Sequence, residues 1–321
     1  MSIVFKPEQA ASLSKGARDF LRATPTIRLP AFLYRYLARP ANVPKMRAQF
    51  QAGEDKIEEQ IINEHGLQLT RLTVSGIPVL VITPPKIAHG LEGFVVLNIH
   101  GGGFVMGTAR DRTALLSAAE FGMPVWSIDY TLAPEARFPV AINECLAVYR
   151  EMVQAHAANR IIGVSSSAGG QIMLAMLLRA HADGLPMPAA LSMYTPASDI
   201  SGVGDSSIAN DGRDVVPLKL SLALMQQNYL NDDDATSPQV SPLYADYPVD
   251  FPPTVISTGT RDLLLSNCVR LFWKIKGAGV KSELLVMEGG WHGFNWEPDL
   301  AEAKQARAAV RDFVVLHLQG K

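Results

Sequence analysis

Cysteine is scarce in this chain, which has 2 among 321 residues. Cys145 and Cys268 cannot build a disulfide framework, and both fall in helix-like sequence, so we expect buried thiols that pack as small apolar residues. The N-terminus lacks a charged start followed by an apolar stretch, and no segment is apolar for long enough to cross a bilayer. These absences predict a cytoplasmic protein with no membrane span.

An excess of charge of either sign is also lacking. The chain has 29 basic and 31 acidic residues, for a net charge of −2. No basic excess attracts nucleic-acid phosphates or anionic lipid, so we expect no nucleic-acid partner. The apolar fraction of 48% and the charged fraction of 19% allow a sizeable core and argue against general disorder. The length suits one large α/β domain with a lid.

Short apolar runs alternate with helical patterns from about residue 67 to the end of the chain. Such runs, rich in Val and Ile, suit parallel strands that are covered on both faces. The first two flank Ser75-Gly76 and predict a hairpin, so we expect a mostly parallel, doubly wound α/β sheet of eight strands with an antiparallel start. The expected strands are 67–74, 77–83, 93–99, 124–128, 161–164, 189–193, 254–258 and 283–287. The expected helices are 138–157, 168–182, 263–278 and 300–318.

Two stretches do not follow this alternation. We expect residues 1–60 to form an N-terminal helical cap segment and residues 61–321 to form the α/β domain, with a cap insertion at about 200–240. The N-terminal helical patterns, at 9–21 and 54–63, lie in a region broken by Pro25, Pro30, Pro40 and Pro44. The insertion carries a helical pattern at 218–229 and, after Asn231, an acidic run at 232–234, which is typical of a solvated turn more than of a metal site. We therefore expect no metal.

Three serines stand between an apolar strand and a helix, in the run from Ser165 to Gly170. A serine on a sharp strand-to-helix turn is exposed as a nucleophile, and the residues two before and two after it must be small. Ser167 meets this requirement, with Ser165 and Gly169 at those positions. Val164 is a poor neighbour for a nucleophile at Ser166, and a nucleophile at Ser165 would place paired glycines later in the helix, where they weaken it. Ser167 is therefore the candidate nucleophile.

A run of three glycines, Gly101 to Gly103, follows another apolar strand directly. Three glycines cost conformational entropy, and here they leave backbone N–H groups unobstructed toward a cavity. An oxyanion on a tetrahedral intermediate needs such donors, so we assign the N–H groups of Gly102, Gly103 and Ala168 to an oxyanion hole. His100 precedes these donors, and we interpret it as a residue that braces the loop.

The base and its orienting acid are expected at later strand ends. His292 follows the last strand, and Asp262 follows the strand before it, so both should reach the sheet edge that carries Ser167. The order Ser167, Asp262, His292 is the order typical of this fold class. Apolar side chains near these motifs, Met106, Trp291 and Phe294, are candidates for a substrate pocket, although core packing explains each of them about as well.

Together these motifs resemble the hormone-sensitive-lipase family of α/β-hydrolases. The motifs that carry the resemblance are 100–104, 129–135, 138–139, 165–170, Asp262 and 292–294. The resemblance covers residues 67–321 and implies an α/β-hydrolase fold with a helical cap, carboxylesterase activity on short to medium acyl esters, no cofactor, and the triad and oxyanion roles given above. It also implies that a homodimer is common in the family.

Two positions depart from the family pattern. Ser165 and Ser166 replace a Gly-Asp pair before the nucleophile, and Ser266 stands where a second acidic residue is frequent. These changes bear on rate and substrate preference more than on the triad. Asp129 and Glu135 are expected to brace the loop that carries their motif.

The expected reaction is acyl transfer. Ser167 attacks a carbonyl carbon, His292 takes its proton, and Asp262 holds the imidazole. The same machinery would open lactones, and amide hydrolysis is a weaker option. A small-molecule receptor on the same fold is the alternative from another class, but a receptor has no need of both Asp262 and His292.

Overall fold

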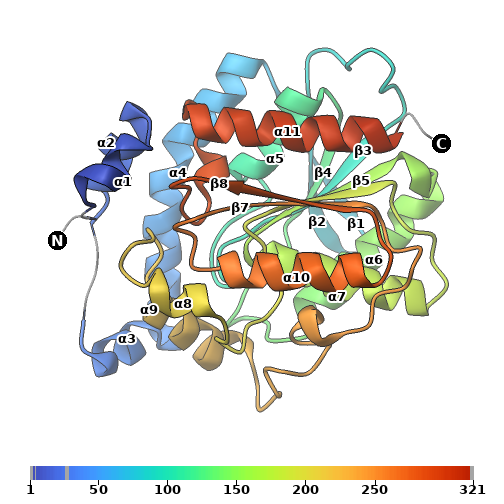
Figure 1. Cartoon of the computed structure of the whole chain (residues 1–321). Coiled ribbons are helices and arrows are strands. Elements are labelled where there is room, and N and C mark those ends of the chain that lie inside the picture. Colours follow the sequence, from blue (N-terminus) through green and yellow to red (C-terminus); the bar gives the residue numbers. More distant parts are fainter. Residues whose placement is uncertain (1–2, 4, 26–28, 319–321) are drawn as a thin grey trace.

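The computed structural model describes residues 3, 5–25 and 29–318. Its centre is a single sheet with the strand order β1-β2-β4-β3-β5-β6-β7-β8 (Figure 1). The β1–β2 and β2–β4 pairs are antiparallel, and every later pair is parallel. The strands are β1 (Gln68–Val74), β2 (Ile77–Thr83), β3 (Val95–Ile99), β4 (Val125–Ile128), β5 (Ile161–Ser166), β6 (Ala190–Tyr194), β7 (Thr254–Gly259) and β8 (Ser282–Met287). This confirms the predicted fold class.

Helices cover both faces of the sheet. α5 (Arg112–Phe121) and α11 (Ala301–Leu318) lie on one face, and α6 (Val140–Ala155), α7 (Ala168–Ala182) and α10 (Leu265–Gly277) lie on the other (Figure 1). Successive strand side chains enter opposite layers, because side chains alternate across a strand. In β3, Val96 packs in the layer of α5 and α11, and Leu97 in the layer of α6, α7 and α10.

The predicted elements of the α/β domain lie within two residues of the observed ones. The exception is α5, which no pattern in the sequence predicts. Residues Arg112 to Ala118 are all buried, so this helix has no exposed face to produce an amphipathic period.

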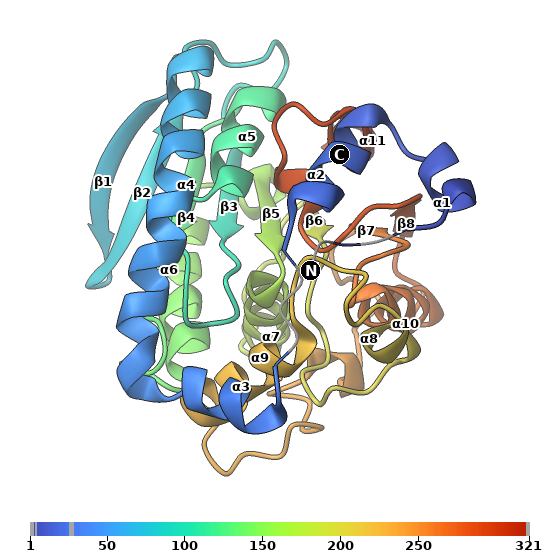
Figure 2. The same ribbon diagram turned by 90° about the vertical axis from the view of Figure 1, so that its left-hand side faces the viewer.

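The N-terminal segment is helical and packs beside the sheet (Figure 2). The pattern at 9–21 is two helices rather than one, since the chain turns between them at residues 12–14. The break predicted at Pro44 is absent: Pro44 lies in the first turn of a 23-residue helix, where its missing N–H is not needed. The helices are α1 (Pro7–Ala11), α2 (Lys15–Ala23), α3 (Ala31–Leu37), the 3₁₀ turn η1 (Pro40–Asn42) and α4 (Val43–His65).

The insertion at 200–240 contributes a second group of helices, which are α8 (Asp205–Ala209), α9 (Leu218–Leu224) and η3 (Met225–Tyr229). Of these, α9 lies against α3 and α8 against α10 (Figure 2). The pattern at 218–229 is helical throughout, but its second half is a π-helix. Three further 3₁₀ turns lie outside the insertion: η2 (Ala158–Arg160), η4 (Pro242–Tyr244) and η5 (Phe294–Trp296).

The described residues bear on two predictions, one about the two cysteines and one about membrane spans. Both cysteines are buried and unpaired, which confirms the interpretation of Cys145 and Cys268 as core residues. Among the helices that the structure describes, none combines the length and the apolar character that a membrane crossing requires.

Candidate active site

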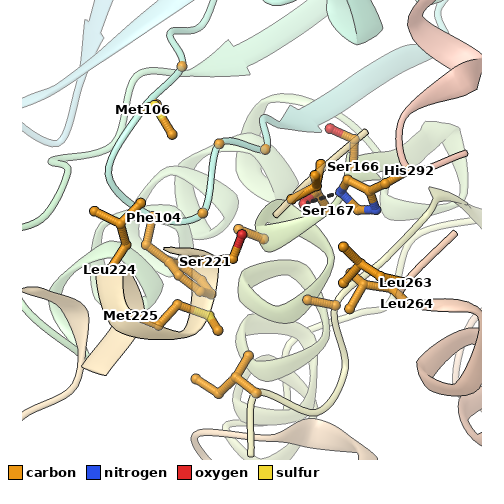
Figure 3. Close-up of a pocket in the computed structure, with 18 of the residues that line it drawn as sticks. Phe104, Met106, Ser166, Ser167, Ser221, Leu224, Met225, Leu263, Leu264 and His292 are labelled. Carbon is orange, nitrogen blue, oxygen red and sulfur yellow. Dashed lines mark hydrogen bonds between the residues drawn. The ribbon is translucent and has the colours of Figure 1, made fainter. Parts of the chain in front are cut away.

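The turn between β5 and α7 places Ser167 at the carboxyl end of the sheet. Its backbone has φ 48° and ψ −121°, a positive φ that is rare and strained for a residue with a side chain. Hydrogen bonds hold this conformation: the Ser167 N–H donates to the Tyr194 carbonyl at 3.0 Å, and its carbonyl accepts from Ala197 N at 2.8 Å. The turn presents the Ser167 side chain to a cavity (Figure 3).

The residues two before and two after Ser167 are small, as a nucleophile on a sharp strand-to-helix turn requires. A side chain on Gly169 would collide with the carbonyl oxygens of Ile99 and His100, so only glycine fits two residues after the serine. Ser165, two residues before it, is fully buried in the sheet. Its hydroxyl and that of Ser166 have no hydrogen-bond partner among the described residues.

The three predicted catalytic side chains form one hydrogen-bonded chain. The Ser167 hydroxyl lies 2.8 Å from His292 Nε2 (Figure 3). On the other side of the ring, His292 Nδ1 lies 3.0 Å from Asp262 Oδ1. The Asp262 carboxylate is itself oriented, because Thr258 Oγ1 donates to its Oδ2 at 2.7 Å and Leu264 N donates to its Oδ1 at 2.8 Å. In this arrangement the proton on Nδ1 faces Asp262, and Nε2 can accept the proton of Ser167.

Two opposing effects act on the pKa of His292. Burial favours the neutral imidazole and lowers the pKa. The charge of Asp262 and its hydrogen bond favour the imidazolium, with a smaller contribution from Asp214. The net effect is a pKa of His292 above its ordinary value. The site therefore favours the charged form of the base that a proton transfer from Ser167 creates.

The glycine run borders the same cavity, and two of its residues have a positive φ. Gly102 has φ +107° and Gly103 has φ +61°, and a side chain on Gly102 would collide with the Met106 carbonyl. Among the described residues, no acceptor takes a hydrogen bond from the N–H of Gly102 or Gly103. Ala168 is the first residue of α7, where an N–H has no partner within the helix. These three N–H groups border the cavity at Ser167 and are free to bind an oxyanion.

His100 lies behind the glycine run. It is fully buried, its Nδ1 lies 2.7 Å from the Gly101 carbonyl, and its ring stacks on Tyr130 with 4.3 Å between centroids. Asp129 accepts a hydrogen bond from Ala109 N at 3.1 Å. These contacts fit loop bracing, and they place His100 away from the triad.

Glu135, the other residue predicted to brace its loop, pairs with the N-terminal segment. Its Oε2 lies 2.8 Å from the Arg47 guanidinium of α4. The same guanidinium donates to the carbonyl oxygens of Val105 and Ala133. Arg47 therefore links α4 to the two loops that flank the cavity.

The cavity at Ser167 has a volume of about 220 Å³ and lies at the carboxyl end of the sheet. Met106 borders it, as predicted. Trp291 and Phe294, the other two predicted pocket residues, do not: they are buried in a separate core cluster with the N-terminal helices, where Trp291 stacks on Phe20 with 4.5 Å between centroids. Trp296 takes their place at the cavity wall, in edge contact with His292.

Most of the remaining wall comes from residues that were not predicted to line a pocket. Phe104, Leu224 and Met225 gather at one side of the cavity, and Leu263 and Leu264 lie near His292 (Figure 3). Helix α4 adds four more lining residues, Phe50, Gln51, Glu54 and Glu58. No local pattern marks these residues, because they meet only when the N-terminal segment and the insertion pack over the sheet.

The described residues contain no group of three or more His, Cys, Asp or Glu side chains that could hold a metal ion. The acidic side chains at 232–234 are exposed, away from the cavity lining.

Comparison with known proteins finds relatives across this region. A family model described as alpha/beta hydrolase fold matches residues 96–295, which include Ser167, Asp262 and His292. An esterase of Acinetobacter venetianus is 33% identical over 230 residues, which cover 68% of this chain and 74% of that protein. An ethyl acetate hydrolase of Pseudomonas putida is 31% identical over 238 residues, which cover 71% of this chain and 74% of that protein.

Solved structures give the same picture over nearly the whole chain. The crystal structure of an esterase, E25, matches with a TM-score of 0.90 at 28% identity, covering 98% of this chain and 97% of that one. A hormone-sensitive lipase from a metagenome library matches with a TM-score of 0.78 at 27% identity, covering 96% of this chain and 99% of that one. The similarity therefore includes the helices outside the sheet as well as the sheet itself.

Proposed function

Because the chain belongs to the hormone-sensitive-lipase family of α/β-hydrolases and is a carboxylesterase, we propose that it cleaves short to medium acyl esters with Ser167 as nucleophile, His292 as base and Asp262 as orienting acid. The observation that carries this proposal is the hydrogen-bonded chain from Ser167 through His292 to Asp262. Those distances allow one proton to pass from Ser167 Oγ to His292 Nε2 as the nucleophile attacks.

In the acylation step, Ser167 Oγ bonds to the ester carbonyl carbon, and the carbonyl oxygen takes the negative charge. The N–H groups of Gly102, Gly103 and Ala168 stabilise that charge, and one such donor typically contributes a factor of about 10²–10³ in rate. His292 then gives its proton to the leaving alcohol, and the acyl group stays on Ser167. Water attacks the acyl-enzyme with His292 again as base, which releases the acid.

The cavity favours small, apolar esters. Its volume of about 220 Å³ is below the range of about 300–1,000 Å³ found for most small-molecule sites. Its wall includes Phe104, Leu224 and Met225, which offer an apolar surface to an acyl chain. We propose that the cap consists of residues 1–60 together with the insertion at 200–240, and that this cap limits chain length.

Two serine variants test the assignment. Ser167→Ala should abolish hydrolysis of p-nitrophenyl butyrate, whereas Ser166→Ala should keep most of it, because only Ser167 contacts His292. Full activity in Ser167→Ala would contradict the assignment. Wild-type activity across p-nitrophenyl esters and lactone rings of increasing size separates an esterase from a lactonase. A wild-type protein that binds these compounds without turning any over would overturn the proposal in favour of a receptor.

A further inference from the structure

A second buried carboxylate lies between the loops that carry Asp262 and His292. Asp214, in the insertion after α8, is 3% exposed. Its Oδ1 accepts hydrogen bonds from the backbone N–H of His292 at 3.0 Å and of Val215 at 2.6 Å. Its Oδ2 accepts one from the N–H of Leu263, which follows Asp262 directly, at 2.6 Å. One side chain thus binds the main chain of both loops.

Other polar contacts tie the insertion to the Asp262 loop. The Asn210 side-chain amide donates to the carbonyl oxygens of Asp262 at 2.9 Å and Thr260 at 3.2 Å. Ser206 and Ser266 exchange two further hydrogen bonds, at 2.9 Å and 2.8 Å. The segment before Asp214 is therefore held in place independently of Asp214, and the carboxylate is not needed merely to attach the insertion.

The charged groups around Asp214 come from three segments. Asp262 and Arg261 belong to the loop after β7, His292 to the loop after β8, and Arg213 is its own neighbour in the chain. Burial and the charge of Asp262 raise the pKa of Asp214, while His292 and the backbone donors act in the opposite direction. The raised pKa of Asp214 is about 7, so above that pH two carboxylates repel each other beside the imidazole of His292, and a positive charge on that imidazole relieves the repulsion.

We propose that Asp214 is a positioning residue for His292 and that its negative charge stabilises the imidazolium formed when Ser167 gives up its proton. The inference rests on the proposed function, in which that proton moves from Ser167 Oγ to His292 Nε2. Asp214 takes no proton in the step. It acts through charge and through the main chain of His292, so the insertion contributes to the chemistry as well as to the cavity wall.

The test compares Asp214→Asn with wild type on p-nitrophenyl butyrate across pH. Asn keeps the size of the side chain and removes the charge, so the pKa of His292 should fall. The midpoint of the acid limb of kcat/KM should move to lower pH, and kcat should fall by up to about tenfold for each pH unit of that shift, because a weaker base accepts the proton of Ser167 less readily. KM should change by less than about twofold, because Asp214 does not border the cavity.

Control variants separate charge from structure. Asp211→Asn removes an exposed carboxylate from the same loop and should match wild type. Asp214→Glu keeps the charge and should keep the wild-type acid limb even if kcat falls. If Asp214→Asn does not fold, Asp214→Ser, which can still accept one N–H, provides the same charge comparison. An unshifted acid limb in the uncharged variant overturns the inference, even where the melting temperature drops. Loss of ester hydrolysis in wild type would overturn the proposed function instead.

Discussion

Arg112 and Glu54 form an ion pair in which Arg112 Nε lies 2.8 Å from Glu54 Oε2. Arg112 begins α5, and Glu54 lies within α4. The same guanidinium lies 3.0 Å from Glu297 Oε1 and donates to the Trp296 carbonyl at 3.3 Å, in the segment that follows His292. Arg112 therefore connects the helix over the cavity to the loop of the candidate base, and all three charged side chains are mostly buried.

Removal of Arg112 should destabilise the fold. Arg112→Ala leaves Glu54 and Glu297 mostly buried without their cation, which typically costs about 3–5 kcal/mol. Urea unfolding at neutral pH measures this loss. The control is Arg150→Ala, because Arg150 pairs with Asp183 at 2.6 Å with both side chains about half exposed. Such an exposed pair contributes about 0–1 kcal/mol. Equal losses in the two variants would contradict a structural role for the Arg112 pair.

In the wild-type pH profile, the acid limb of kcat/KM should have its midpoint at a pH above the ordinary pKa of histidine. His292 must be neutral to accept the proton of Ser167, so kcat/KM falls as the pH drops through its pKa. Burial alone would lower that pKa, but Asp262 outweighs burial and raises it above 6.5. We expect the acid limb to have its midpoint above pH 6.5 with an aryl ester as substrate. A midpoint below 6.5 would mean that burial dominates.

Strand ends were the part of the site that the sequence could predict. Ser167, Asp262 and His292 each follow a short apolar run, and parallel strands bring their carboxyl ends to one edge, so their proximity follows from chain order alone. The three side chains indeed meet within 3.0 Å of one another along the chain of hydrogen bonds. The need for a small residue two positions after the nucleophile was also predictable, and Gly169 indeed has no room for a side chain.

Contacts between distant segments could not be predicted in this way. Trp291 lies one residue before His292, yet its ring packs on Phe20, because the N-terminal helices cover that part of the loop. Asp214 reaches both catalytic loops from an insertion with no strand pattern of its own. Helix α5 could not be predicted for another reason. Its N-cap residue is recognisable, since Asp111 Oδ1 accepts a hydrogen bond from Ala114 N at 3.0 Å. Its residues are buried on nearly all sides, however, so the sequence shows no amphipathic period.

Glu58 should make stability depend on pH. It lies in α4 at 2.8 Å from Arg110, but burial outweighs this pairing and raises its pKa to about 7. Between its ordinary value of 4.5 and 7, the folded state holds the proton more tightly than the unfolded chain, so this group's contribution to stability falls as pH rises through that window. Glu58→Gln has no proton to lose, so its stability relative to wild type should increase between pH 5 and pH 8.

Urea unfolding at pH 5 and pH 8 measures that difference for Glu58→Gln. Glu59→Gln changes an exposed neighbour in the same helix and should show no such dependence on pH. A difference that stays constant between the two pH values would mean that Glu58 titrates in its ordinary range when folded.

Catalysis should depend on the conformation of the glycine run. A side chain on Gly102 would collide with the Met106 carbonyl, so Gly102→Ala has to shift the loop that carries the proposed oxyanion donors. Loss of one such donor typically lowers kcat by about 10²–10³-fold. Gly90→Ala is the matched control, because Gly90 has φ +80° with open space around it, so it imposes similar backbone strain at a distance from the site. Steady-state kinetics on p-nitrophenyl butyrate should show the loss only in Gly102→Ala. A Gly102→Ala enzyme that keeps wild-type kcat would remove this loop from the oxyanion hole.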